Sequence, residues 1–418
     1  MKYCLILFIG ILFSQEHYED LDFICDYDGD GKRNDCELFQ QFGDNSWSTK
    51  DYRGAVDQYF TMLLCKCINK NNVRVYKDLG LSYEKLGLLD STVWSFEQGL
   101  NLDKNNKDLL WNSARILTKL NKNGDKDNLE TLYYYFDRLL ELDPGDVSIL
   151  EKYSEVYKNN GQYEEQINIL DQWLKIDPDS KKAINNKKNA YENLGMDETE
   201  VDKERWEKES SNLEYGISYV ESLMKNENFD KSIEVCEELI LLHPEDKRLL
   251  KLISKSYIKN LDDKKAVKYL EKLVKVDYDN TNVMIDLSIT YMNLYEFNKS
   301  YSWANNAINT NKMRGKAFFQ RAEVLVQAVD YYRSDELDFC DRLIYDLATE
   351  DYQLAYENGQ LNAKIYKNNL KELVTTVGDW FLLGEDFKEL SPNSSKCKEQ
   401  IKSEDYYGFI DRKVARKE

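Results

Sequence analysis

The eight residues LLELDPGD at 139–146 decide the fold, because closely similar stretches occur twice further along the chain. These are WLKIDPDS at 173–180 and ILLHPEDK at 240–247, and the three prolines are Pro144, Pro178 and Pro244. The first interval between prolines is 34 residues and the second is 66, which is close to two intervals of 34. Since proline cannot continue a helix, each stretch predicts the end of one repeating unit.

The same spacing continues beyond the prolines. Counting forward from Pro244 by 34 reaches Tyr278 and then Lys312, and counting backward from Pro144 reaches Lys104 after a six-residue insertion. Inside each unit, small and large apolar residues occupy fixed slots, which in 247–280 are Ile253, Ser254, Tyr257, Ala266, Leu270 and Leu273. The small residues let two antiparallel helices approach closely, and the large ones bury against the neighbouring pair. Stacked pairs of this kind predict a solenoid.

A 34-residue period with this internal pattern resembles the tetratricopeptide repeat. The resemblance covers approximately Glu37 to Val374. It implies an all-α fold, an α-solenoid of about seven to eight antiparallel helix pairs. It further implies that the first helix of each pair lines a concave groove that holds a peptide or a partner protein.

The domain organisation follows from where the repeat is regular. We expect a signal peptide at 1–14, an N-terminal cap at 15–37, repeat arrays at 37–212 and 213–374, and an irregular tail at 375–418. The first helix of 36–69, ELFQQF, is expected to be short, and the second half of 181–212 to be a charged, kinked helix. After Arg314 a turn lengthened by DYYRSDELDFCDR and a final amphipathic helix, AKIYKNNLKELVTTV, are expected.

Composition argues against several functions. The formal net charge is -19, so the chain lacks the basic balance that binding to nucleic acid or to anionic lipid needs. It has two histidines, His17 and His243, too few for a zinc hydrolase site with the usual ligand spacing. Common nucleotide-binding, metalloprotease and serine-hydrolase motifs are missing from the sequence. Catalytic residues are therefore not expected.

The first residues predict export. An apolar run of eleven residues, Tyr3 to Phe13, follows Lys2 and ends at the small residue Ser14. This run is too short to span a bilayer, and it is typical of a cleavable secretory signal. The mature protein is then expected in the periplasm, associated with the outer membrane, or secreted, with no transmembrane segment. Disulfides persist in such compartments.

Removal of Cys4 with the signal leaves seven cysteines, an odd number. The positions of these cysteines resemble those of exported tetratricopeptide proteins of Gram-negative bacteria. We predict a disulfide between Cys340 and Cys397, because a terminal repeat that has lost its outer neighbour needs another constraint; two buried thiols are the alternative. Cys236 occupies a core slot and is expected to be a buried free thiol. The pairing of Cys25, Cys36, Cys65 and Cys67 is left open.

The segment DYDGDGKRNDCE at 26–37 has the spacing of a twelve-residue calcium loop. Its candidate ligand positions 1, 3, 5, 7, 9 and 12 are Asp26, Asp28, Asp30, Lys32, Asn34 and Glu37. Gly31 stands at position 6, where such loops turn sharply, and Lys32 would offer its carbonyl oxygen. The segment resembles EF-hand and thrombospondin type 3 loops, which implies a structural Ca²⁺. Arg33 departs from the EF-hand pattern, and a solvated acidic linker is the alternative.

A basic stripe is the candidate for partner binding. Arg248, Lys251, Lys255 and Lys259 recur at three- and four-residue spacing, so they share one helix face. The resemblance places these slots in the groove, where they could bind a carboxylate-rich segment. A solvated face balanced by nearby acids is the alternative. The stripe departs from the carboxylate clamp that binds chaperone C-termini, which spreads its polar residues over three repeats.

These observations favour an exported scaffold or adaptor that binds a protein or peptide, and whose partner cannot be read from the sequence. Two alternatives from other classes are an envelope-associated enzyme and a calcium-stabilised structural component of a cell-surface assembly. Turnover of an envelope polymer would support the enzyme, and a stable protein partner would support the scaffold.

Overall fold

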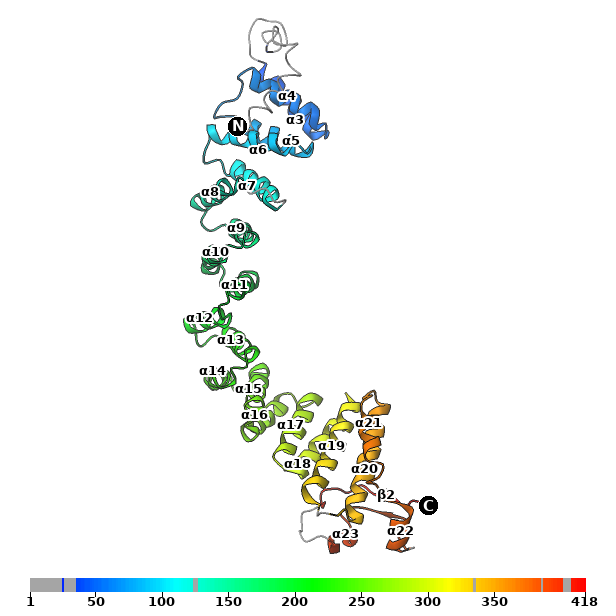
Figure 1. Ribbon diagram of the computed structural model, residues 1–418. Coiled ribbons are helices and arrows are strands. Elements are labelled where there is room, and N and C mark those ends of the chain that lie inside the picture. The colour runs from blue at the N-terminus through cyan, green and yellow to red at the C-terminus, as the bar shows by residue number, and fades with distance from the viewer. Residues whose placement is uncertain (1–24, 26–34, 123–126, 334–335, 385, 401–406) are drawn as a thin grey trace. The chain divides into compact units, whose positions relative to one another are not determined.

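The computed structural model describes residues 25, 35–122, 127–333, 336–384, 386–400 and 407–418 (Figure 1). The described chain divides into two compact units, Met1–Asp197 and Glu198–Glu418. Helices of the first unit are α3 (Cys36–Ser48), α4 (Tyr52–Leu64), α5 (Arg74–Lys85), α6 (Leu89–Leu102), α7 (Lys107–Lys122), α8 (Leu129–Leu142), α9 (Val147–Asn159), α10 (Tyr163–Ile176) and α11 (Lys181–Asn193).

The second unit continues with α12 (Thr199–Lys208), α13 (Leu213–Lys225), α14 (Phe229–Leu242), α15 (Lys247–Lys259), α16 (Asp263–Val276), α17 (Thr281–Asn293), α18 (Phe297–Asn309), α19 (Arg314–Tyr332), α20 (Phe339–Glu357) and α21 (Ala363–Asn369). The tail adds α22 (Val377–Leu383), β1 (Glu389–Leu390), α23 (Ser395–Gln400) and β2 (Val414–Ala415). The two strands pair antiparallel, with Glu389 opposite Ala415 and Leu390 opposite Val414.

Consecutive helices form antiparallel pairs, which confirms the expected all-α solenoid. The pairs are α3–α4, α5–α6, α7–α8, α9–α10, α13–α14, α15–α16, α17–α18 and α19–α20. In the repeat at 181–212, α11 packs on α10 and α12 packs on α13. The chain passes from the first compact unit to the second between these helices, at Asp197 and Glu198, whereas the sequence predicts the boundary between the two repeat arrays at 212 and 213.

Helix starts and turns explain the repeat pattern in physical terms. After Pro244, the Asp246 side chain accepts hydrogen bonds from the backbone N–H groups of Arg248 and Leu249, at 2.9 and 3.0 Å, and so caps α15. The turn between the two helices of a unit needs a left-handed residue. Gly161 fills this slot in the unit of α9 and α10, with φ +71°.

Tyrosines join neighbouring repeats through partly buried hydrogen bonds. The hydroxyls of Tyr153 and Tyr257 donate to Asp137 and Glu237, at 2.8 and 2.5 Å. Each tyrosine lies on the first helix of one repeat, and its acceptor lies on the second helix of the preceding repeat. Burial, together with these carboxylates, raises the pKa of both phenols, so they stay neutral donors. The arrangement places aromatic surface in the core while satisfying its polar end.

Three local expectations are wrong in detail. The first helix, α3, is not short but runs through GDNSWS to Ser48, because Gly43 lies against the ring of Tyr59 and this packing outweighs the weak helix preference of those residues. The turn after α19 is shorter than expected, since Asp338 and Asp341 form a capping box that starts α20. The final amphipathic helix, α21, is the third and ends at Asn369.

The charged segment after Gly195 forms the ten-residue helix α12.

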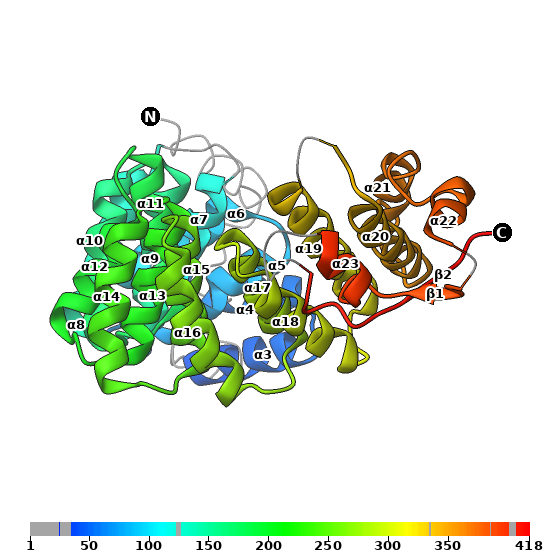
Figure 2. The ribbon, with the colours of Figure 1, turned by 90° about the horizontal axis from the view of Figure 1, so that it is seen from below.

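The structure contains three disulfides among its described cysteines: Cys25–Cys65, Cys36–Cys67 and Cys340–Cys397. Cys340 lies in the first turn of α20, not in an irregular cap, and Cys397 lies in α23. Figure 2 shows α23 and the strands beside α20. The sulfur of Cys236 is a buried free thiol, and burial raises its pKa to about 12.

Candidate protein-binding face

The basic stripe occupies the solvent side of α15. Arg248, Lys251, Lys255 and Lys259 are all exposed, while Leu249, Leu250, Ile253 and Tyr257 of the same helix are buried. The 3.6-residue period of the helix separates the two sets, so the stripe faces away from the core. The four cations therefore lie together on one face, as the sequence spacing predicts.

Arg248 at one end of the stripe is already paired. Its two terminal nitrogens donate to the Glu214 carboxylate on α13 at 3.0 and 2.7 Å, and Asp246 lies 3.5 Å away. The hydrogen bond with Glu214 raises the pKa of Arg248. Both partners are more than half exposed, so the pair contributes little to stability. It does neutralise this end of the stripe.

The three lysines are differently placed. Within the residues that the structure describes, no carboxylate lies within 4.0 Å of the ammonium groups of Lys251, Lys255 or Lys259. Asp286 on α17 faces them at longer range. Burial raises the pKa of Asp286, and the positive charges of Lys255 and Lys251 act in the opposite direction. The lysines thus retain capacity for a further anion.

Apolar residues occupy the equivalent slots on the next first helix, α17. One period of 34 residues after Lys251 and Lys255 stand Ile285 and Ile289, so these isoleucines hold the same slots on α17. Ile289 is 37% exposed, and Ile285 and Met292 are partly buried at the edge of the core. We call Lys251, Lys255, Lys259, Ile285, Ile289 and Met292 the basic–apolar face. Its cationic half suits carboxylates and its apolar half suits a hydrophobic side chain.

The sequence spacing predicts the stripe residues but not the residues around them. Glu214, Asp286 and Ile289 all lie about one 34-residue period from stripe residues. The period could therefore have identified them, had it been used to align helix faces as well as core slots.

The candidate calcium loop falls mainly outside the described residues. Asp26, Asp28, Asp30, Lys32 and Asn34 are among those not described, and Glu37 is exposed in the first turn of α3. Over the described ranges, no group of three or more histidine, cysteine or acidic residues could hold a metal ion. Both flanking cysteines are described: Cys25 pairs with Cys65 and Cys36 with Cys67, so the loop's two ends are tied to positions two residues apart.

No helix in the described part of the chain combines the length and the apolarity needed to cross a bilayer.

Comparisons with known proteins bear on the repeat. Solved structures that are similar include a MamA protein, with 21% identity, 43% of this chain and 94% of that chain covered, and a TM-score of 0.34. A tetratricopeptide repeat protein from Parabacteroides merdae has 16% identity, 69% of this chain and 98% of that chain covered, and a TM-score of 0.34. YrrB, described as a TPR protein with an unusual peptide-binding site, has 13% identity, 56% of this chain and 97% of that chain covered, and a TM-score of 0.30. No curated protein sequence matches the chain. Residues 147–180, which form α9, α10 and the turns beside them, match the tetratricopeptide repeat family, so the solenoid contains a repeat of this family in its first unit.

Proposed function

We propose that the protein is an exported, non-enzymatic scaffold that binds a protein or peptide along the first helices of its repeats. In the second unit, the basic–apolar face would bind a segment that carries carboxylates next to an apolar side chain. The observation that carries this proposal is that three exposed lysines lack close carboxylates among the described residues, while the exposed Ile289 holds the equivalent slot on the next first helix. Charges of this kind steer association and set register, while the apolar contact adds buried area.

Charge reversal tests the face. Lys251→Glu with Lys255→Glu is expected to weaken partner binding by at least about tenfold, because attraction becomes repulsion at the centre of the face. The partner would be isolated on the wild-type protein from an envelope extract, identified, and its affinity then measured on purified components. Binding to the wild type should also weaken as salt is added.

A matched variant separates the face from net charge. Lys264→Glu with Lys275→Glu makes the same charge change on α16, the second helix of the same unit, where both lysines are exposed. It is expected to leave affinity unchanged. Equal loss in both variants, or no loss in the first, would exclude the basic–apolar face as the site.

We further propose that the loop at 26–37 binds one structural Ca²⁺ and fixes the N-terminal cap onto α3. What supports this is the ligand spacing together with the two disulfides that tie both ends of the loop. Tied ends reduce the entropy that the loop loses when it closes around the ion. A single loop of the extracellular type should bind weakly, with Kd on the order of 10⁻⁴ to 10⁻³ M.

Calorimetry on the mature protein tests the calcium proposal. We expect heat from millimolar Ca²⁺ with the wild type and none after Asp28→Ala with Glu37→Ala. Asp35→Asn removes one acid at position 10, which is not a ligand position, and should leave the heat unchanged. Reduction of the flanking disulfides should weaken binding because the loop ends are released. Absence of calcium heat in the wild type would make the segment a linker.

A further inference from the structure

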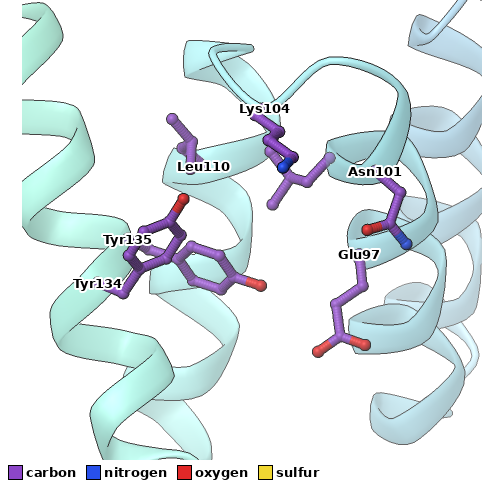
Figure 3. A pocket seen from close by; sticks show the side chains of 7 residues that line it. Glu97, Asn101, Lys104, Leu110, Tyr134 and Tyr135 are labelled. Atoms are coloured by element: carbon purple, nitrogen blue, oxygen red, sulfur yellow. The ribbon is translucent and has the colours of Figure 1, made fainter.

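A separate pocket lies in the first unit, between α6 and α8 (Figure 3). Its volume is about 270 Å³. Tyr134 and Tyr135 of α8 form one side, and Glu97 and Asn101 of α6 form the other, with Lys104 at the rim. Pockets for small molecules usually have about 300 to 1,000 Å³, so this one suits a single long side chain better than a cofactor.

Glu97 is the group that needs a partner. Its carboxylate is partly buried, and burial raises its pKa. Within the described residues, no lysine or arginine nitrogen lies within 4.0 Å of it. Its charge also contributes to the raised pKa of Tyr135, although burial of that phenol is the larger cause. A partly desolvated carboxylate of this kind gains from a cation that donates hydrogen bonds.

One cation, Lys104, lines the pocket, and within the described residues its ammonium lies more than 4.0 Å from the Glu97 carboxylate. Two further cations on the neighbouring helices are held elsewhere. Arg138, on the same helix as the tyrosines, donates to Asn105 at 3.1 and 2.6 Å and also pairs with Glu141. Lys107 pairs with Asp143 at 3.0 Å. None of these three cations forms an ion pair with Glu97, so its carboxylate can accept an external cation.

The aromatic side selects what kind of cation fits. Tyr134 is 53% exposed, and its ring lies 5.8 Å from that of Tyr135 at an interplanar angle of 56°. Leu100 and Leu110 supply apolar lining. A planar guanidinium can stack on a tyrosine ring while its N–H groups bond a carboxylate, and its methylenes can contact the leucines. A carboxylate ligand would instead meet the charge of Glu97.

We propose that this pocket receives an arginine side chain of a partner protein, and that lysine is a weaker substitute. The guanidinium lies between Tyr134 and the Glu97 carboxylate, and Asn101 offers its side-chain oxygen as a second acceptor. The site is independent of the basic–apolar face, which lies in the other unit and has the opposite charge preference. The acidic net charge of the chain favours approach of such a basic segment.

The probe is the pentapeptide acetyl-Gly-Gly-Arg-Gly-Gly-amide, titrated into the mature protein in 150 mM salt and followed by NMR. We expect saturable binding with Kd on the order of 1 mM. The same peptide with citrulline keeps the shape but not the charge, and should not saturate. Glu97→Gln should weaken binding about tenfold and Tyr134→Ala about threefold. Lys104→Ala should strengthen it, because a like charge leaves the rim.

Glu130→Gln is the matched control, since Glu130 is exposed in the first turn of α8 and does not line the pocket. Its affinity should equal that of the wild type. Unsaturable binding of the arginine peptide, equal binding of the citrulline peptide, or equal weakening in Glu97→Gln and Glu130→Gln would each overturn the proposal. Glu97 and Tyr134 are partly or largely exposed, and circular dichroism of each variant would establish that it is folded.

Discussion

Replacing Asp351 by alanine is expected to destabilise the second unit by about 3–5 kcal/mol, the usual cost of leaving buried charges without their partner. Asp351 lies on α20 and is fully buried. It accepts hydrogen bonds from Arg321 of α19 at 2.8 and 2.6 Å and from Arg412 of the tail at 2.7 Å. One carboxylate thus holds two guanidinium groups, 30 and 61 residues away in sequence, and so links α19, α20 and the tail.

The size of the effect follows from the surroundings of Arg412. Burial is the largest single influence on Arg412 and lowers its pKa, but the charge and hydrogen bond of Asp351, together with the charges of Tyr301 and Glu350, outweigh burial, so the pKa of Arg412 is raised. Arginine does not give up its proton in proteins, so removal of Asp351 leaves both cations charged. Asp351→Asn keeps the volume and one acceptor but not the charge, and should lie between alanine and the wild type.

Hydrogen exchange can locate this loss, because amides of α20 and of 407–418 should exchange faster in Asp351→Ala. Urea unfolding would give the free energy. Glu350→Ala is the matched control: Glu350 pairs with the same Arg412 at 2.7 Å but is 60% exposed, so about 1 kcal/mol or less is expected. Similar losses in the two variants would mean that burial of Asp351 does not determine its contribution.

Regular repeats could be predicted from the sequence because local and long-range signals agree there. In 247–280, the buried Ile253, Tyr257 and Leu270 stand at the slots that the period assigns, and the helices α15 and α16 follow. Pro144 and Pro244 follow the ends of the second helices α8 and α14, and the acids Asp146 and Asp246 cap the next first helices, α9 and α15. Each unit repeats the same problem, so one correct solution extends to its neighbours.

The ends of the solenoid could not be predicted in the same way. The polar GDNSWS segment of α3 is helical because of a contact with Tyr59, which is not local in sequence. The left-handed slot filled by Gly161 is occupied by Glu227, Leu261 and Tyr295 in the second unit, with φ of 57°, 60° and 60°. Such a conformation costs about 1–2 kcal/mol for a residue with a Cβ, so the repeat holds it against local preference. A search for glycine at this slot misses these turns.

The same distinction between local patterns and contacts distant in sequence applies to the candidate sites. The stripe on α15 was predictable because four cations share one helix and obey its period. The pocket at Glu97 was not, because it depends on how α6 and α8 are placed around it. This placement is not encoded in a local pattern.

The second large effect is expected from the Cys340–Cys397 bridge. Cys340→Ser with Cys397→Ser should destabilise the end of the second unit by about 4 kcal/mol, because the bridge closes a loop with a sequence separation of 57. Both cysteines are fully buried beside Leu343, Trp380 and Leu390, so the cluster that joins the tail to α20 would lose its covalent link. Peptide mapping without reductant should recover the two cysteines in one linked peptide.

Packing and covalent linkage can be separated with reductant. Serine also places a hydroxyl in an apolar cluster, so Cys340→Ala with Cys397→Ala is the appropriate companion pair. Reductant should accelerate hydrogen exchange of 386–400 in the wild type but not in either double variant. Two disulfides lie in the first unit, and exchange measured segment by segment keeps their reduction apart from this one. Alkylation of Cys340 in the native, unreduced protein would contradict the bridge. A double-serine variant as stable as the wild type would show that non-covalent contacts suffice to hold the tail. One such contact is the ion pair of Lys417 with Asp346 at 2.6 Å.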